Sequence, residues 1–300
     1  MANHAKDMVR AALAADSLAL GVHWIYDIEK IKSDHGRVEN LIAPGIGSYH
    51  STKKRGEFTH YGDQMLVLLA SISDGGFDTD RFFKDWQALF KDYSGYMDMA
   101  TKATLKNIAN GKGLTDCGSV SNDIAGAARI APLVLSLRDD TAALEQAART
   151  QTRMTHNDEA TIDTAAFFAR VCKACLDGEK PAAVIKEIAN TIFAESLVGF
   201  WADQGLSAAD QDSLEAVSRF GQSCHTNEAF SGVVQIIARY ENDPGQGIVE
   251  AVMAGGDNAA RASLVAQVLT AYNGADASIE KWFEELVQKD LITQYLDRIS

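Results

Sequence analysis

The chain has 300 residues, 46% of them hydrophobic and 23% charged, which is typical of a folded globular protein and argues against disorder. Its 41 acidic and 28 basic residues give a net charge of −13, which argues against binding nucleic acid or an anionic membrane, because both need a basic face. No apolar run of 18 residues and no secretory leader are seen, and four cysteines are too few to staple such a chain, so we expect a reduced, cytoplasmic protein.

Apolar residues recur at helical spacing along nearly the whole chain, and only four prolines interrupt them. This pattern predicts helices over 5–20, 64–72, 78–90, 97–110, 124–137, 141–152, 158–176, 182–195, 208–220, 228–240, 247–253, 258–272, 279–288 and 291–298. Asp78 is expected to cap the third of these helices. No stretch alternates as strands do, and the longest irregular stretch, 34–61, is a candidate functional loop. We therefore expect an all-α protein with one domain covering residues 1–300.

Two of the four cysteines form a single CxxC pair, Cys172 and Cys175, inside the predicted helix 158–176. A structural zinc site of this kind needs a second pair of ligands, which the chain lacks. The pair therefore indicates thiols in the core or on the helix surface. A CxxC redox centre in an unrelated helical enzyme is a lesser alternative.

Polar residues interrupt the apolar helices at two places in the first quarter of the chain. Asp16 lies in an otherwise apolar stretch, where a carboxylate faces solvent, caps a neighbouring helix or finds other partners, because burial of a bare charge is costly. Asp63 lies just ahead of the apolar run 65–72, a position that suits a helix cap or a cation ligand.

Two further polar clusters open predicted helices in the second half of the chain. His156 stands near the start of the helix 158–176, where it fills a turn or contacts a ligand. Gly255 and Gly256 precede Asp257 and an alanine-rich helix. Two glycines allow the backbone to approach another segment or a ligand closely, and the helix start directs free N–H groups to that place. Asp257 is then placed to cap the helix or to bind a metal.

Asp63 and Asp257 are far apart in the sequence, yet each begins a helix that we expect to be buried, so the two carboxylates could converge. Hard oxygen ligands of this kind suit Mg²⁺, which keeps several waters and needs few carboxylates. Such an ion orients substrate oxygens and polarises a water or a leaving group.

Taken in order, these segments resemble the motifs of the ADP-ribosylglycohydrolase family, and the resemblance extends from about residue 8 to residue 274. The matching segments are Ala15-Asp16-Ser17-Leu18-Ala19, Tyr61-Gly62-Asp63-Gln64, Ser121-Asn122 with Ala128-Arg129-Ile130-Ala131-Pro132, Thr155-His156, and Gly255-Gly256-Asp257-Asn258-Ala259-Ala260. The phrase Gly21-Val22-His23-Trp24-Ile25-Tyr26-Asp27 is similar to a branch that includes the jellyfish J-type lens crystallins. The resemblance implies a compact, single-domain orthogonal bundle of helices.

The departures from the family pattern concern the metal ligands. Family members use paired Mg²⁺ ions held by six Thr and Asp side chains. Of those six positions only Asp63 and Asp257 keep a carboxylate, while Asn258 offers a neutral oxygen. The resemblance therefore implies one Mg²⁺ ion at most, held by these three residues.

The first function that we consider is hydrolysis of an ADP-ribosyl or related nucleotide glycoside bond. Its catalytic residues would be Asp16 as a general base if burial raises its pKa, together with Asp63 and Asp257. The substrate, a small molecule or an ADP-ribosylated residue, would be contacted by the remaining motif residues. These are His23, Tyr61, Ser121, Asn122, His156, Gly255, Gly256 and Arg261, of which Arg261 would hold a diphosphate.

The second function is that of a catalytically degenerate ligand-binding protein or a crystallin-like structural protein on the same fold. The missing metal ligands favour it. The surviving polar clusters oppose it, because a purely structural protein gains from apolar residues at these buried positions.

Overall fold

The computed structural model of the chain describes residues 2–299, and these form helices, two isolated β-bridges and no strand. The helices are α1 (Ala2–Leu20), α2 (Ile28–His35), α3 (His60–Ser73), α4 (Thr79–Leu89), α5 (Met99–Ala109), α6 (Ala125–Ala128), α7 (Ala131–Leu137), α8 (Thr141–Arg153), α9 (Glu159–Leu176), α10 (Pro181–Thr191), α11 (Leu197–Ser207), α12 (Ser213–Phe220), α13 (Thr226–Arg239), α14 (Pro244–Met253), α15 (Asn258–Asn273), α16 (Ala277–Glu284) and α17 (Lys289–Arg298). The all-α prediction is confirmed.

Aspartate begins many of these helices, and its carboxylate accepts a backbone N–H of the first turn. Asp78, which the sequence predicts as a cap, accepts from Arg81 N at 2.7 Å. The same bond is made by Asp27, Asp98, Asp140, Asp158, Asp212, Asp243 and Asp276. Negative charge is favourable at this end of a helix. Part of the acidic excess of the chain therefore serves to start helices.

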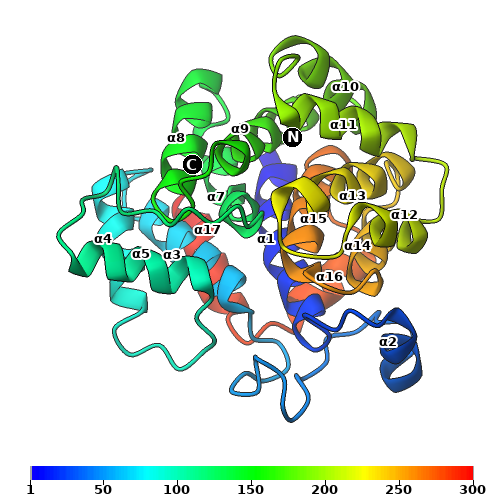
Figure 1. Cartoon of the computed structure of the whole chain (residues 1–300), viewed down its shortest axis with the longest axis horizontal. Helices are drawn as coiled ribbons and strands as arrows, with labels where there is room; N and C mark the ends of the chain where they lie inside the picture. Colours follow the sequence, from blue (N-terminus) through cyan, green and yellow to red (C-terminus); the bar gives the residue numbers. More distant parts are fainter. Residues whose placement is uncertain (1, 300) are drawn as a thin grey trace.

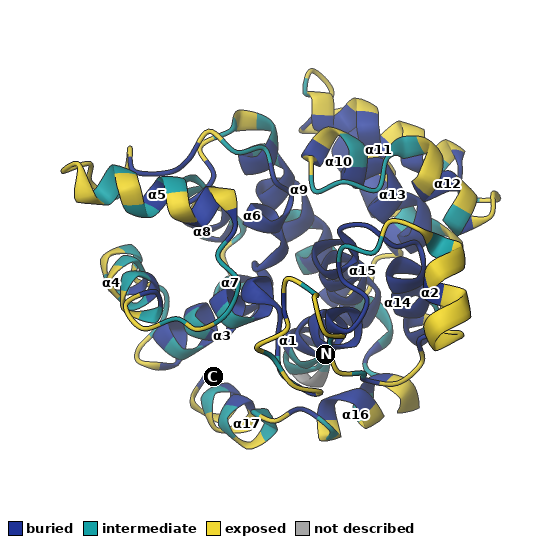
Figure 2. Cartoon of the chain, turned by 60° about the horizontal axis from the view of Figure 1, so that its bottom comes forward, coloured by how far each residue is buried: buried dark blue, intermediate teal, exposed yellow. Residues whose placement is uncertain are grey.

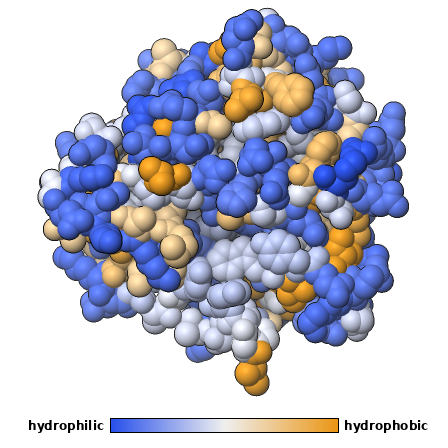
Figure 3. Space-filling view, in the orientation of Figure 1, coloured by the Kyte–Doolittle hydropathy of each residue, from blue (hydrophilic) through white to orange (hydrophobic). Residues whose placement is uncertain are grey.

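Helix α15 lies at the centre of the molecule, and α1 runs along it (Figure 1). Helices α9, α13 and α14 also pack on α15, so residues 258–271 are all buried. Figure 2 shows the same helices as the dark interior, with exposed residues on the outer helices and loops. Apolar residues are scattered over the mostly hydrophilic face in Figure 3. This arrangement fixes the start of α15, which carries Asp257, inside the protein.

Two helices were not predicted from the sequence, α2 and α11. Helix α2 is short and mostly exposed, so it has no apolar stripe to reveal it. Helix α11 contains two glycines and carries apolar residues on several sides. The predicted helix 208–220 begins later, at Ser213, where Asp212 is the cap. The irregular stretch predicted over 34–61 is confirmed for residues 36–59.

The expectation that Asp63 starts its helix was wrong by one turn. Helix α3 begins at His60, and Thr59 caps it by accepting from Tyr61 N at 3.1 Å. Asp63 is therefore in the first turn of the helix, where its side chain pairs with Lys53 and Tyr93.

The cysteines are free thiols, and Cys172 and Cys175 lie on α9 in the hydrophobic core, as predicted. Burial raises the pKa of both thiols, so they are unreactive at neutral pH. In residues 2–299 no helix has the length and apolar character that crossing a bilayer requires.

Candidate functional site

Three loops meet at the start of α15. Backbone N–H groups of Ile124 and Asp257 donate to the carbonyls of Cys224 and Gln222, each at 2.8 Å, and so join the loop before α6, the loop before α13 and the turn before α15. These bonds bring one ligand atom each of Asp123, Cys224 and Asp257 within 4.8 Å of one another. Among residues 2–299 no other set of three such acidic, histidine or cysteine side chains is gathered so closely.

Tyr61 of α3 completes this group. Its hydroxyl lies 3.1 Å from Asp257 Oδ2 and 3.4 Å from Asp123 Oδ2. We call Tyr61, Asp123, Cys224 and Asp257 the acid cluster. Tyr61, Asp123 and Asp257 are buried, whereas Cys224 is partly exposed, so the cluster reaches the surface through Cys224. Asp257 Oδ1 is buried and accepts no hydrogen bond from the residues that the structure describes.

The two carboxyls of the cluster hold protons more tightly than free aspartates. Burial raises the pKa of Asp123 well above its usual range, and the charge of Asp257 raises it further. Burial also raises the pKa of Asp257, although Arg261 and the Tyr61 hydroxyl oppose the shift. Two close carboxyls do not readily ionise together. The two carboxyls therefore resist being ionised at the same time.

A pair of glycines allows the turn before Asp257 to pass between two other segments. Gly255 and Gly256 have φ of +66° and +64°, the left-handed conformation. Gly256 accepts from Trp24 N at 2.9 Å and donates to Ile25 O at 2.8 Å. A Cβ on Gly256 would lie 2.1 Å from Gln222 O. These glycines therefore allow the turn to pack closely against two other segments of the protein, rather than against a ligand.

Asn258 and Arg261, both predicted ligand or substrate residues, are buried behind this turn. Asn258 Oδ1 pairs with His23 Nδ1 at 3.1 Å, and Asn258 Nδ2 donates to Val252 O at 3.0 Å. The guanidinium of Arg261 donates to Ala251 O and Gly255 O, at 3.1 and 2.9 Å. The positive charge of Arg261 opposes the rise in the pKa of Asp257 that burial causes. A diphosphate can meet this buried guanidinium only if the turn moves.

Asp16, the predicted general base, lies at the start of α3. Its Oδ2 accepts from Thr59 N at 2.8 Å, and its Oδ1 accepts from Thr59 Oγ1 at 2.6 Å and Gly62 N at 3.1 Å. Burial raises the pKa of Asp16 to about 6 in spite of these bonds. A Cβ on residue 62 would lie 2.4 Å from Asp16 Oδ2, so Gly62 provides the space for the carboxylate. Of the alternatives that the sequence left open for Asp16, the structure shows that its carboxylate caps a neighbouring helix, α3.

Asp63 lies in a different polar group. Its Oδ2 is 2.5 Å from Lys53 Nζ and 2.5 Å from the Tyr93 hydroxyl. Burial raises the pKa of Asp63, and Lys53 opposes that shift. Within residues 2–299 no hydrogen bond or ion pair joins Asp63 to Asp257. The structure therefore brings Asp257 to Asp123 rather than to Asp63.

The other predicted substrate residues occupy two positions. Ser121 and Asn122 are partly exposed beside the acid cluster, and Asn122 Oδ1 pairs with His225 Nδ1 at 2.7 Å. His156 is buried, with Nδ1 on Thr155 Oγ1 at 2.8 Å and no partner for Nε2 among the described residues. Burial and nearby Arg129 lower the pKa of His156 to about 3, so the ring is neutral.

A group of imidazole and aromatic rings borders the acid cluster, and sequence reasoning singled out only His23 among its members. His50 Nε2 and His60 Nδ1 are 3.2 Å apart, and the ring centroids of His60 and Tyr61 are 3.9 Å apart. The group contains His23, Trp24, Tyr49, His50, His60 and Tyr96. Burial lowers the pKa of His50 to about 3 and that of His23 well below its usual range. The sequence signals for the group were the segment 21–27 and the histidines of the irregular stretch 34–61.

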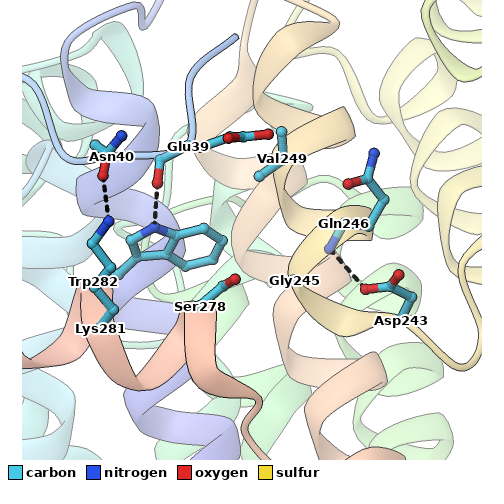
Figure 4. A pocket seen from close by; sticks show the side chains of 9 residues that line it. All are labelled: Glu39, Asn40, Asp243, Gly245, Gln246, Val249, Ser278, Lys281 and Trp282. Atoms are coloured by element: carbon cyan, nitrogen blue, oxygen red, sulfur yellow. Dashed lines mark hydrogen bonds between the residues drawn. The ribbon is translucent and has the colours of Figure 1, made fainter.

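Two surface cavities are described here because of their positions relative to the acid cluster and the ring group. One, of about 420 Å³, is lined by His23, Trp24, Tyr49 and the loop 45–48, so it reaches the ring group. The other, of about 300 Å³, lies between α14 and α16 (Figure 4). There Trp282 Nε1 donates to Glu39 O at 2.9 Å, and Lys281 Nζ donates to Asn40 Oδ1 at 2.6 Å. Neither cavity is lined by a residue of the acid cluster, although the first reaches the ring group that borders it.

Comparison with known proteins identifies the family of the chain. A family model described as ADP-ribosylglycohydrolase matches residues 1–300. The chain belongs to the ADP-ribosylglycohydrolase family. It is 24% identical to Crystallin J1A of Tripedalia cystophora over 321 aligned residues, which cover 99% of this chain and 98% of the crystallin. It also matches a solved structure described as an ADP-ribosylglycohydrolase-related protein complex, with a TM-score of 0.73, 18% identity, and coverage of 99% and 97% of the two chains.

This ADP-ribosylglycohydrolase family member does not present the oxygen ligands that a pair of Mg²⁺ ions needs. Asp63 already pairs with Lys53, and Asn258 already pairs with His23. Asp257 instead faces a second carboxyl, a phenol and a thiol. Mg²⁺ prefers six oxygen ligands and has little affinity for sulfur. The residues at this site thus do not fit the paired Mg²⁺ centre of other family members, and the single Mg²⁺ ion expected from the sequence stays a prediction.

Proposed function

We propose that this protein hydrolyses an ADP-ribosyl or related nucleotide glycoside bond, with Asp123 and Asp257 as its acid–base pair. The observation that carries the proposal is the pair itself: two buried carboxyls with raised pKa values, beside a tyrosine hydroxyl and next to the surface. Proton-sharing carboxyl pairs with shifted pKa values are typical of catalytic sites. Membership of the family supports the class of substrate.

In this proposal the carboxyl that is ionised accepts a proton from the attacking water. The protonated carboxyl gives its proton to the leaving group as the glycosidic bond breaks, and the water oxygen then bonds to the anomeric carbon. Oxygens of the two carboxyls lie within 4.8 Å of each other, so both groups would act from one face of the sugar. Tyr61 donates to Asp257 Oδ2 and so holds that carboxylate in place. Ser121 and Asn122, at the edge of the cluster, are the residues placed to contact the sugar or phosphate groups.

The test is release of free ADP-ribose from a panel of ADP-ribosylated amino acids and peptides, measured by chromatography in the presence of EDTA. We expect Asp257→Asn and Asp123→Asn each to lower the rate by about 100-fold or more, because each removes a proton donor or acceptor. Asp80→Asn is the matched control, since Asp80 is exposed on α4, and it is expected to keep the wild-type rate.

A structural role is the second candidate, favoured by the match to Crystallin J1A and by the Lys53 ion pair at Asp63. It predicts no release of ADP-ribose from any member of the panel by the wild-type protein. That result would contradict hydrolysis, whereas turnover that depends on Asp123 and Asp257 would contradict a purely structural role.

A further inference from the structure

The acid cluster also has the chemistry of a metal site different from the one expected in this family. It gathers two carboxylates and one thiol, from Asp123, Asp257 and Cys224, with their ligand atoms all within 4.8 Å of one another. Ligands of a tetrahedral zinc ion lie roughly 3–4 Å apart, given bonds of about 2.0–2.3 Å. A shift of about 1 Å would therefore bring all three atoms onto one ion.

We propose that Asp123, Cys224 and Asp257 form a binding site for a single thiophilic divalent cation of the zinc class. A second observation, separate from the short distances between the three side chains, supports this metal site. Asp257 Oδ1 is buried and has no hydrogen-bond partner among the described residues, although unpaired carboxylate oxygens are costly to bury. An ion bound by both oxygens of the Asp257 carboxylate would supply that missing partner.

The sulfur ligand decides which metal the site selects. Thiolate favours Zn²⁺ and Cd²⁺ and disfavours Mg²⁺, which binds oxygen ligands almost exclusively. The Tyr61 hydroxyl, 3.1 Å from Asp257 Oδ2, orients that carboxylate or supplies a fourth oxygen. Partly exposed Cys224 provides the route by which an ion enters.

Binding of the ion must displace protons. The thiol of Cys224 loses its proton to become a ligand, and any proton held by the two carboxyls is displaced as well. Protons therefore leave when the ion binds, and affinity rises as the pH rises. The metal site does not depend on the proposed hydrolysis. A bound ion would displace protons from Asp123 and Asp257 and occupy their oxygens, so neither could act as an acid or a base, and added Zn²⁺ is expected to slow that reaction.

The experiment is a titration of the full chain with Cd²⁺, followed by the ultraviolet charge-transfer absorption of a cadmium–thiolate bond. We expect one ion per chain, displacement by Zn²⁺, and no displacement by a hundredfold excess of Mg²⁺. Cys224→Ala should remove the absorption band and weaken binding by about 100-fold or more, and Asp257→Asn should weaken binding by at least about tenfold. Cys175→Ala, a buried thiol on α9, is the matched control and should keep the band.

Calorimetric titration in two buffers of different ionisation enthalpy gives the number of protons released, which we expect to be at least about one per ion, from the Cys224 thiol. A band of full intensity in Cys224→Ala, ready displacement by Mg²⁺, or binding without proton release would each overturn the proposal. These readouts need no substrate. A failure of the metal site is therefore distinguishable from a failure of the proposed hydrolysis.

Discussion

Replacement of Asp16 by alanine is expected to lower the free energy of unfolding by about 3–5 kcal/mol at pH 7. Three donors, the backbone N–H groups of Thr59 and Gly62 and the Thr59 hydroxyl, would lose their acceptor in a fully buried place. Loss of a helix cap costs about 1 kcal/mol, and each buried donor left without a partner costs about 1–3 kcal/mol. Urea denaturation followed by circular dichroism measures the effect.

Asp7→Ala is the matched control, because Asp7 lies on the same helix with its carboxylate 3.5 Å from Arg10 near the surface. We expect a change below about 1 kcal/mol there, as for most surface ion pairs. If Asp16→Ala unfolds at the same urea concentration as Asp7→Ala, then the Asp16 carboxylate does not hold the start of α3.

The stability of the protein should also depend on pH through Asp16. Its pKa is about 6 in the folded protein and 3.8 when free, so the folded state binds the extra proton between these values. The contribution of this group is complete below about pH 4 and is lost as the pH rises to about 6, by an amount on the order of 3 kcal/mol. Asp16→Asn is neutral at every pH and is expected to lack this dependence. An identical slope in both proteins would contradict the assignment.

Gly256→Ala is expected to lower the free energy of unfolding by about 3–5 kcal/mol and to distort the acid cluster. A left-handed φ of +64° costs an alanine about 1–2 kcal/mol. The new Cβ would also lie 2.1 Å from Gln222 O, so the turn must move and break the bond from Asp257 N to that same oxygen. Thermal unfolding measures the loss of stability.

Gly111→Ala separates the two causes. Gly111 also has a left-handed φ, +87°, but a Cβ there meets no atom within 4 Å. We expect a loss of about 1 kcal/mol from strain alone. Equal losses in the two variants would show that close packing of the turn against Gln222 contributes nothing to stability.

The turn before Asp257 illustrates what the sequence and the structure each specify about the candidate site. Adjacent glycines ahead of an alanine-rich helix predict a turn whose backbone lies close to another segment or to a ligand. The sequence left open whether the approach is to a ligand or to the chain, and the structure places the backbone of residues 25 and 222 there. A pair of glycines in a sequence indicates that the backbone is closely approached there, but it does not indicate which group makes the approach.

Asp123 and Cys224 were missed because neither carries a local signal. Asp123 follows the noted Ser121-Asn122 pair but begins no long helix, and Cys224 is a lone thiol in a loop. They become neighbours of Asp257 only through backbone bonds between three loops that are distant in the sequence. Asp63, in contrast, was singled out for its place before an apolar run, and the fold directs it to Lys53.

The sequence by itself determined that the chain is helical, where most of its helices lie, and which family it belongs to, because caps, apolar periods and ordered motifs are local properties of the chain. The tertiary structure decided which acids meet. Asp16 serves a helix start, Asp63 pairs with a lysine, and Asp257 joins Asp123, Cys224 and Tyr61. The physical reason is that the charge state and the ligand chemistry of a carboxylate depend on neighbours a few ångströms away, and packing alone selects those neighbours.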